Sequence, residues 1–326
     1  MVSANVDKSA GDLLVYRKLV TFAGLASVAT GVAFVFIKFA VWLFSGSSSI
    51  FASFTDSMFD SFASLINLIT LRYSLTPADR EHRYGHFKAQ ALASLAQAAF
   101  IGGSAVLLII HGIDKFRHPQ EVENTLIAIG ISGVTIAITL ILVAFQGFVY
   151  SRTRSELVYA DRFHYLSDVG LNFGVVVALW LSFYGYLWAD GLFASLIGLL
   201  ILRGAWKIGY DAANTLVDKT LEVHENQIIM KSLLTTPGVK SIHDLKTRKA
   251  GPQYFIQCHL VLDPLLSLQE AHAIASAAEK KVRDSGFREA DISLHMEPDL
   301  PETAADAKIY VEDLEAGEKD AETKVI

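Results

Sequence analysis

Residues 49–74, SIFASFTDSMFDSFASLINLITLRYS, form an apolar stretch that is long enough to cross a membrane and yet contains two aspartates, Asp56 and Asp60. A carboxylate in the hydrocarbon core costs at least about 2.5–3.5 kcal/mol, so an aspartate there indicates a functional site. Positions i and i+4 share one face of a helix, which directs both side chains to the same place. The stretch therefore predicts a membrane-spanning helix with a pair of cation-binding carboxylates.

A second apolar stretch, YADRFHYLSDVGLNFGVVVALW, repeats this spacing with His164 and Asp168. Two such helices, packed face to face, would bring three carboxylates and one imidazole together. Mixed nitrogen and oxygen ligands suit a four-coordinate transition metal, with zinc as the first candidate, whereas calcium and magnesium prefer oxygen alone. The alternative is that each aspartate only hydrogen-bonds to a neighbouring helix. Two pairs of potential ligands with the same i, i+4 spacing favour the metal site.

The composition is that of a membrane protein, since hydrophobic residues make up 52% of the 326 residues and occur in long runs. The net charge of -6 argues against nucleic acid as a partner. The single cysteine, Cys258, excludes an internal disulfide framework and a cysteine metal cluster. We expect six spans, at about 18–45, 49–74, 87–114, 124–149, 157–185 and 188–211.

The distribution of lysine and arginine predicts the orientation of these spans. The side opposite the termini carries only Lys115 and Arg117 in its loops. We therefore expect both termini of this multi-pass protein in the cytoplasm. The basic residues on the side of the termini are Arg17, Lys18, Arg72, Arg80, Arg83, Lys88, Arg152, Arg154, Arg162, Lys207 and Lys219.

From about residue 220 the pattern changes to a soluble order of helix, two strands, helix and strand. Two helices over a three-stranded sheet predict a compact ferredoxin-like module. The expected fold class is thus an α-helical membrane protein, with six transmembrane helices followed by a ferredoxin-like α+β cytoplasmic domain. The expected segments are a flexible N-terminus (1–15), the transmembrane domain (16–215), the cytoplasmic metal-binding domain (216–300) and a disordered acidic tail (301–326).

Two further groups of potential metal ligands lie outside the spans. In PADREHRYGHF, Asp79, His82 and His86 are spaced to bind one metal on a loop, although a solvated loop is the alternative. In the soluble module, Glu297 lies two residues after His295, on the same strand face. Four histidines on elements that must pack together favour a metal cluster over unrelated surface residues. They are His243, His259, His272 and His295.

With DSMFD in the second span and HYLSD in the fifth, the chain resembles the cation diffusion facilitator family, in particular its bacterial YiiP-type zinc and iron efflux transporters, over about residues 15–300. The YiiP type has aspartate at the position of Glu297 and an acidic residue at that of Gln90. The resemblance implies a transport site (Asp56, Asp60, His164, Asp168), a loop site (Asp79, His82, His86) and a binuclear cytoplasmic site (His243, His259, His272, His295, Glu297).

The resemblance also implies a homodimer in the bacterial inner membrane, and it suggests a charge interlock between Lys88 and Asp218. We expect a secondary active transporter that exports divalent transition metals, zinc first, with cadmium, iron(II), cobalt and manganese also compatible. Metal binds only deprotonated ligands, which predicts exchange for protons. His164 is the candidate for the proton-coupled ligand, because imidazole titrates nearest to neutral pH.

Two other classes of function compete with transport. The first is a membrane-bound metal sensor without transport, against which the intramembrane carboxylates argue. The second is an intramembrane metalloprotease, but the sequence lacks the HExxH motif of such enzymes. We therefore expect that the protein is not an enzyme.

Overall fold

The structure is a computed structural model that describes residues 2–45, 48–118, 125–184, 186 and 188–300. The chain divides into a helical unit, Ala10–Leu216, and a second compact unit, which groups residues 1–9 with the chain from Val217 onward. The division falls one residue after the boundary expected from the sequence. The expected disordered acidic tail, 301–326, lies outside the described residues.

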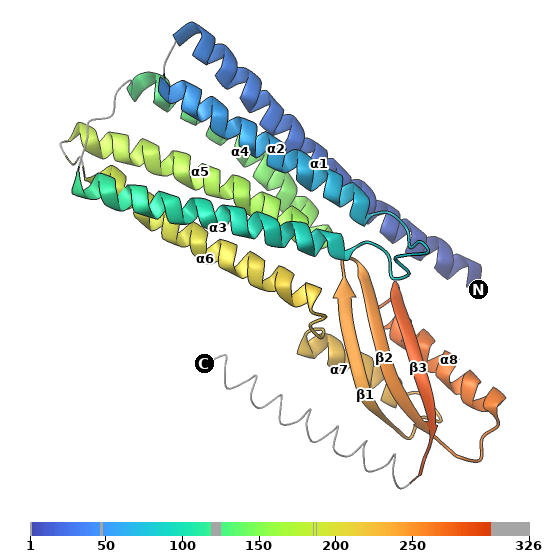
Figure 1. Ribbon diagram of the computed structural model, residues 1–326. Helices are drawn as coiled ribbons and strands as arrows, with labels where there is room; N and C mark the ends of the chain where they lie inside the picture. The colour runs from blue at the N-terminus through green and yellow to red at the C-terminus, as the bar shows by residue number, and fades with distance from the viewer. Residues whose placement is uncertain (1, 46–47, 119–124, 185, 187, 301–326) are drawn as a thin grey trace. The chain divides into compact units, whose positions relative to one another are not determined.

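The helical unit consists of six long helices that run side by side as a bundle (Figure 1). Each helix corresponds to one expected span. The first begins at Val2, within the segment that was expected to be flexible, because residues 2–15 contain no proline and continue directly into the apolar run. The helices are α1 (Val2–Ser45), α2 (Ser48–Ser74), α3 (Lys88–Arg117), α4 (Thr125–Thr153), α5 (Glu156–Phe183) and α6 (Ala189–Leu216).

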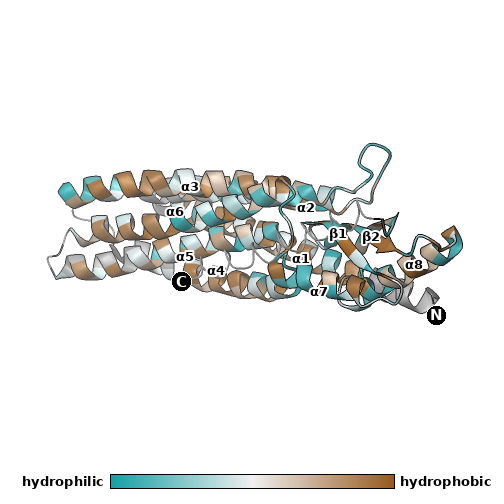
Figure 2. Ribbon diagram, turned by 90° about the horizontal axis from the view of Figure 1, so that it is seen from below, coloured by the Kyte–Doolittle hydropathy of each residue, from teal (hydrophilic) through white to brown (hydrophobic). Residues whose placement is uncertain are grey.

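The surface of the bundle is apolar. Phe36, Leu200 and Trp206 are 68%, 69% and 78% exposed, and apolar residues run along the helices (Figure 2). Such a surface is suited to lipid rather than to water. Four stretches of the described residues are long and apolar enough to cross a membrane, namely Leu13–Phe44, Lys88–Arg117, Gly133–Thr153 and Gly191–Leu216.

Helices α2 and α5, which carry the predicted metal ligands, do not reach that apolarity within the described residues. Their aspartates, histidine and serines lower the mean hydropathy. Polar residues of this kind occur inside membranes where they face a cavity or the interior of a bundle. That all six helices cross the membrane therefore stays a prediction.

Helices α3 and α6 pack with their backbones close together at two glycines. A Cβ atom on Gly191 would lie 2.3 Å from the backbone N of Phe116 and 2.5 Å from the carbonyl oxygen of Gly112. A Cβ atom on Gly112 would in turn lie 2.8 Å from the backbone N of Ser195. Small residues at such a contact let membrane helices gain van der Waals packing.

The second unit has the order of elements that was expected from the sequence. A three-stranded sheet has the order β1-β2-β3, with β1 and β2 antiparallel and β2 and β3 parallel. Helix α8 forms the crossover between the two parallel strands, as such a pair requires. The elements are α7 (Val223–Leu234), β1 (Ser241–Ala250), β2 (Gln253–Leu262), α8 (Leu268–Asp284) and β3 (Ala290–Pro298).

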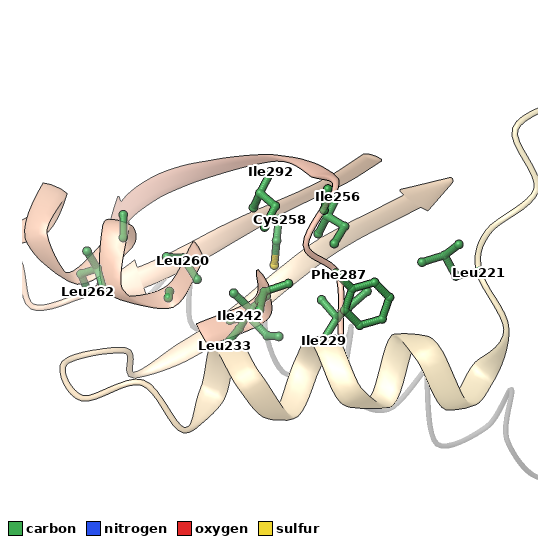
Figure 3. Packing of buried hydrophobic residues seen from close by; sticks show 14 residues of the cluster. Leu221, Ile229, Leu233, Ile242, Ile256, Cys258, Leu260, Leu262, Phe287 and Ile292 are labelled. Atoms are coloured by element: carbon green, nitrogen blue, oxygen red, sulfur yellow. The ribbon is translucent and has the colours of Figure 1, made fainter. Parts of the chain in front are cut away.

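One face of the sheet packs on the two helices and forms the hydrophobic core of this unit (Figure 3). Ile256, Cys258 and Leu260 of β2 are 0–1% exposed and contact the buried face of α7 at Ile229 and Leu233. Side chains alternate between the two faces of a strand. The odd-numbered residues of β2, including His259, therefore lie on the opposite, open face.

Candidate metal centres

The centre of the helical unit lies between α2 and α5. His164 Nε2 is 3.2 Å from Asp60 Oδ1 and 4.0 Å from Asp168 Oδ2. One ligand atom from each of the three residues lies within 4.8 Å of the others. Three of the four predicted ligands are thus brought together by two helices at one height. Asp56 lies one turn before Asp60 on α2, and its side chain is outside the described residues.

The geometry of this centre suits two ligands that face one ion. His164 is buried, and its Nε2 has no partner in hydrogen-bond geometry among the described residues, although Asp60 Oδ1 is only 3.2 Å away. Zinc–ligand bonds of about 2.0–2.1 Å in a tetrahedron place the ligand atoms about 3.3 Å apart. The imidazole and the carboxylate are at this separation, so the donor set and its spacing both fit a transition metal.

A cavity of about 190 Å³ adjoins the centre. Asp60 and Asp168 line it together with Lys38, and Lys38 Nζ donates to Ser57 Oγ at 2.7 Å. The ammonium group is thus hydrogen-bonded inside the bundle, on the wall of the same cavity as the two carboxylates. A single charge in an otherwise apolar span was the signal for this role.

The loop between α2 and α3 brings all three of its predicted ligands together. His82 Nδ1 is 3.4 Å from Asp79 Oδ1, and His86 Nε2 is 3.4 Å from Asp79 Oδ2. The backbone N–H groups of His82 and Glu81 donate to Asp79 Oδ1, and these bonds, first that of His82, lower the pKa of the carboxyl group. His86 is buried, whereas the other two ligands are exposed.

In the second unit, the strand register forms a row of three histidines on the open face of the sheet. His259 of β2 lies opposite His243 of β1 and beside His295 of β3. Glu297 contacts all three: Oε2 is 2.9 Å from His243 Nε2, and Oε1 is 2.8 Å from His259 Nδ1 and 3.6 Å from His295 Nε2. Both carboxylate oxygens are engaged, which is the arrangement of a bridging ligand.

The electrostatics of this row favour a charged carboxylate. Burial alone would raise the pKa of Glu297, but the hydrogen bond from His243 and the positive charges of protonated His259 and His243 outweigh it and lower the pKa. His259 Nδ1 has no partner in hydrogen-bond geometry among the described residues, despite its 2.8 Å approach to Glu297. As between α2 and α5, an imidazole nitrogen lies close to a carboxylate oxygen without hydrogen-bond geometry. The row of histidines therefore also fits a metal ion.

Asp244 is a further candidate ligand that the sequence analysis missed. Its Oδ2 is 3.8 Å from His259 Nε2. The residue has a φ of 51° at the irregularity in register between His243 and Lys246, and this bulge turns it toward the row. A positive φ at a non-glycine residue leaves no readable signal in a single sequence.

Two other residues of the second unit lie away from this row. His272, predicted as a ligand, is exposed on α8, the helix that covers the opposite face of the sheet, and it joins no ligand cluster among the described residues. Its role as a ligand stays a prediction. Cys258 points into the core, where burial and the charge of Asp244 raise the pKa of its thiol to about 12. The thiol therefore stays protonated and is not a metal ligand.

Lys88 and Asp218, the predicted interlock, belong to different units. Lys88 Nζ donates to the carbonyl oxygen of Leu216 at 3.2 Å, within the helical unit. Asp218 Oδ1 accepts from Arg248 Nη1 at 3.0 Å, within the second unit. Each residue thus has a partner in its own unit, and the interlock stays a prediction.

A helical unit with an apolar surface and buried ligands, followed by a small α/β unit with a second set of ligands, defines a membrane transporter of cations. Residues 24–217 match the family model of the cation efflux transmembrane domain, and residues 221–299 match that of the cation efflux protein cytoplasmic domain. The chain belongs to the cation efflux family, the cation diffusion facilitators.

Curated relatives match along most of this chain. The cation-efflux pump FieF of Shewanella oneidensis is 46% identical over 283 residues, which are 87% of this chain and 95% of the relative. FieF of Cronobacter sakazakii is 44% identical, over 87% of this chain and 94% of the relative. Among solved structures, the metal-bound C-terminal domain of the CzcD transporter from Thermotoga maritima is 25% identical and covers 23% of this chain and 88% of its own, with a TM-score of 0.22.

Family membership confirms several of the expectations. The fold class is a helical membrane domain followed by an α+β cytoplasmic domain, and the protein is a transporter rather than an enzyme or a sensor. The second unit is the family's cytoplasmic dimerisation domain. The metal and its direction, the counter-ion and the roles of single residues are proposals.

Proposed function

We propose that this protein exports divalent transition-metal ions, zinc first, from the cytoplasm in exchange for protons. It works as a homodimer in the bacterial inner membrane, with both termini in the cytoplasm. The observation that carries the proposal is the convergence of Asp60, His164 and Asp168 from α2 and α5 beside a cavity that the two aspartates line. The names of the relatives, which are cation-efflux pumps, and the basic residues on the side of the termini support the direction.

The donor set supports a transition metal as the substrate. One imidazole and two or more carboxylates match zinc, and the same set accepts cadmium, iron(II), cobalt and manganese, because affinity order alone does not set selectivity in a cell. Calcium and magnesium prefer sites with oxygen ligands only. The nitrogen ligand His164 Nε2 therefore favours transition metals over calcium and magnesium.

Proton exchange follows from the chemistry of the ligands. Only the neutral imidazole and the ionised carboxylates bind metal, so metal and protons compete for one centre. Protons that arrive from the more acidic outside would displace the metal there. Their release on the inside would restore the centre for the next ion.

The two other centres have supporting roles in this proposal. The loop of Asp79, His82 and His86 binds metal at the end of α2 and so raises its local concentration near the bundle. The row of His243, His259 and His295, bridged by Glu297, holds resident metal that stabilises the cytoplasmic domain and its dimer. Bound metal supplies a cross-link between β1, β2 and β3 there.

Asp60→Ala tests the transport centre. Loss of an outer-shell partner of a metal ligand costs about 10- to 100-fold, so loss of a ligand itself is expected to lower zinc flux by more than about tenfold. The measurement is zinc entry into sealed proteoliposomes under an imposed pH gradient, read with an internal fluorescent zinc indicator. Asp60 is only partly buried, so the variant is expected to fold.

The matched control is Asp114→Ala, which removes an exposed aspartate at the end of α3. Flux in this control is expected to equal that of the unchanged protein. Near-normal flux in Asp60→Ala would remove this residue from the transport centre. Zinc flux that neither responds to the pH gradient nor moves protons would refute the exchange itself.

A further inference from the structure

Asp161 is a second buried carboxylate in the helical unit, and the metal centre does not use it. It lies on α5 three residues before His164 and is 6% exposed. A carboxylate at such a place is costly unless the surrounding groups solvate it or a proton neutralises it.

Three donors from three other helices surround this carboxylate. Ser27 Oγ of α1 and Gln146 Nε2 of α4 donate to Oδ2 at 2.5 and 2.8 Å, and Asn67 Nδ2 of α2 donates to Oδ1 at 3.3 Å. These groups present hydrogen atoms to the carboxylate, whereas a metal ion would require lone pairs. The cluster is therefore suited to a proton and not to a second metal ion.

Ser27 allows the cluster to satisfy both protonation states of Asp161. Its Oγ lies 2.5 Å from Asp161 Oδ2 and 3.0 Å from the carbonyl oxygen of Ala23, but a hydroxyl has only one proton to donate. When Asp161 is ionised, Ser27 donates to it. When Asp161 is protonated, it donates to Ser27 Oγ, and Ser27 donates to Ala23. Gln146 Nε2, 2.9 Å from Ser27 Oγ, remains a donor in both states.

A small cavity lies beside the carboxylate. It measures about 10 Å³, roughly the space for one water molecule, and Asp161, Asn67 and Gln146 are among its lining residues. Gln146 Oε1 is buried and has no hydrogen-bond partner among the described residues.

Tyr165 connects this cluster with the wall of the metal cavity. Its hydroxyl donates to the carbonyl oxygen of Ser27 at 3.0 Å, lies 3.0 Å from Ser64 Oγ, and lines the cavity that holds Asp60 and Asp168. A change in the hydrogen bonds of Ser27 would therefore occur next to Tyr165, which lines the metal cavity.

The ionisable groups around Asp161 come from its own helix. They are His164 and Tyr165 of α5, while the described contacts from the neighbouring helices are neutral, namely Ser27 (α1), Asn67 (α2), Gln97 (α3) and Gln146 (α4). A doubly charged metal ion held by His164, Asp60 and Asp168 would add positive charge near Asp161 relative to the empty centre. Positive charge nearby favours the ionised carboxylate.

We propose that Asp161 is a proton-binding site of the exchanger, separate from the metal ligands. The carboxylic acid is present while the metal centre is empty. On metal binding the O–H bond breaks, the electron pair stays on the carboxylate, and the proton is released to the solvent. This inference rests on the proton exchange of the proposed function and adds the residue that carries one of the protons.

Asp161→Asn tests the site, because it keeps the size of the side chain but cannot release a proton. The purified full-length protein, free of metal and weakly buffered, is titrated with zinc, and the released protons are measured with a pH indicator. We expect a release lower by about one proton per zinc ion bound and a zinc affinity weaker by about tenfold or more, because a carboxyl group that loses its proton on zinc binding must favour zinc by that factor when it is ionised. Asp161→Glu is expected to restore the release, and Asp114→Asn is the matched control.

The outcomes separate the two proposals. If the unchanged protein exchanges protons and Asp161→Asn releases as many, Asp161 is not the site, while the proposed function stands. If the unchanged protein moves zinc without protons, both proposals fail.

If Asp161→Asn does not fold, the zinc-induced infrared difference spectrum decides. The unchanged protein must lose the C=O band of a protonated carboxylic acid, and Ser27→Ala must shift that band. Absence of the band overturns the inference.

Discussion

Lys38 places a positive charge on the wall of the cavity that receives divalent cations in the proposed function. Its ammonium group is held by Ser57, one turn before Asp60 on α2. The charge stabilises the carboxylates while no metal is bound, and it repels a metal ion that enters. Both effects lower the affinity for metal, which suits a transporter that must release its substrate.

We expect Lys38→Met to bind zinc at least about tenfold more tightly, since about 1.4 kcal/mol of relieved repulsion corresponds to a factor of ten. The longer residence of the ion is expected to slow transport at saturating zinc. Calorimetric titration and vesicle flux measure the two effects. Lys38→Arg, which keeps the charge, should behave like the unchanged protein. Equal or weaker zinc binding in Lys38→Met would contradict the assigned role.

Single residues differ in how far the sequence reveals them. Asp60, His164 and Asp168 were predictable because their spacing alone puts ligands on one helix face. For Asp161 the sequence predicts only a charge near the start of a span. Its proposed role depends on Ser27, which lies on a helix far away in the sequence. The side-chain partners of a buried charge are set by the packing of helices, and this packing cannot be derived from one sequence.

At the scale of elements, the helices can be predicted from apolar runs and the strands from the alternation of apolar and polar residues. The register between neighbouring strands cannot be predicted in this way. A helix lies at each expected span, and the order of the cytoplasmic elements matches that of the structure. The row of His243, His259 and His295 required the pairing of β1 with β2 and of β2 with β3, and the bulge near Asp244 was not foreseeable. Pairing between strands is decided by contacts across the sheet.

The close packing of α3 on α6 leads to a prediction for Gly191. In Gly191→Val, the new Cβ would lie 2.3 Å from the backbone of Phe116, so α3 and α6 must separate. We expect a loss of at least about 1–3 kcal/mol of stability, the usual cost of overpacking. The yield of monodisperse protein and its thermal unfolding in detergent measure this loss.

Gly103→Val is the matched control on α3, because a Cβ atom there meets no atom within 4 Å among the described residues. Its yield and unfolding temperature are expected to stay close to normal. Equal behaviour of the two variants would show that the close approach at Gly191 does not matter for the bundle.

At the scale of the whole molecule, the two units are stabilised by different means. The bundle relies on close helix contacts and on polar groups in its interior, while the cytoplasmic unit has its own hydrophobic core. The other face of its sheet carries the row of histidines beside the apolar residues Phe255 and Val261. Metal on that face would add stability where the core of a small domain is limited.

We predict that zinc stabilises the full-length protein through this row. Zinc at about 100 times its Kd contributes about 2.7 kcal/mol to a folded state that alone binds it. In His259→Ala/His295→Ala this increment and the corresponding resident metal should be lost, while a chelator should reproduce the loss in the unchanged protein. Thermal unfolding and metal content measure both effects.

His224→Ala, a change of an exposed histidine on α7, is the control for this prediction. It should keep the zinc-dependent stabilisation in full. A double variant that retains its metal content would refute the cluster. His272→Ala adds a test of the remaining predicted ligand, which belongs to the centre only if the variant loses metal.

The register of the sheet has a consequence for how metal stabilises it. A slip of β3 by one residue would turn His295 and Glu297 from the open face into the core and would leave His259 without its neighbours. Only the correctly paired sheet can then hold the ion. Metal bound at the row would therefore stabilise the correct pairing of β3 relative to a slipped one.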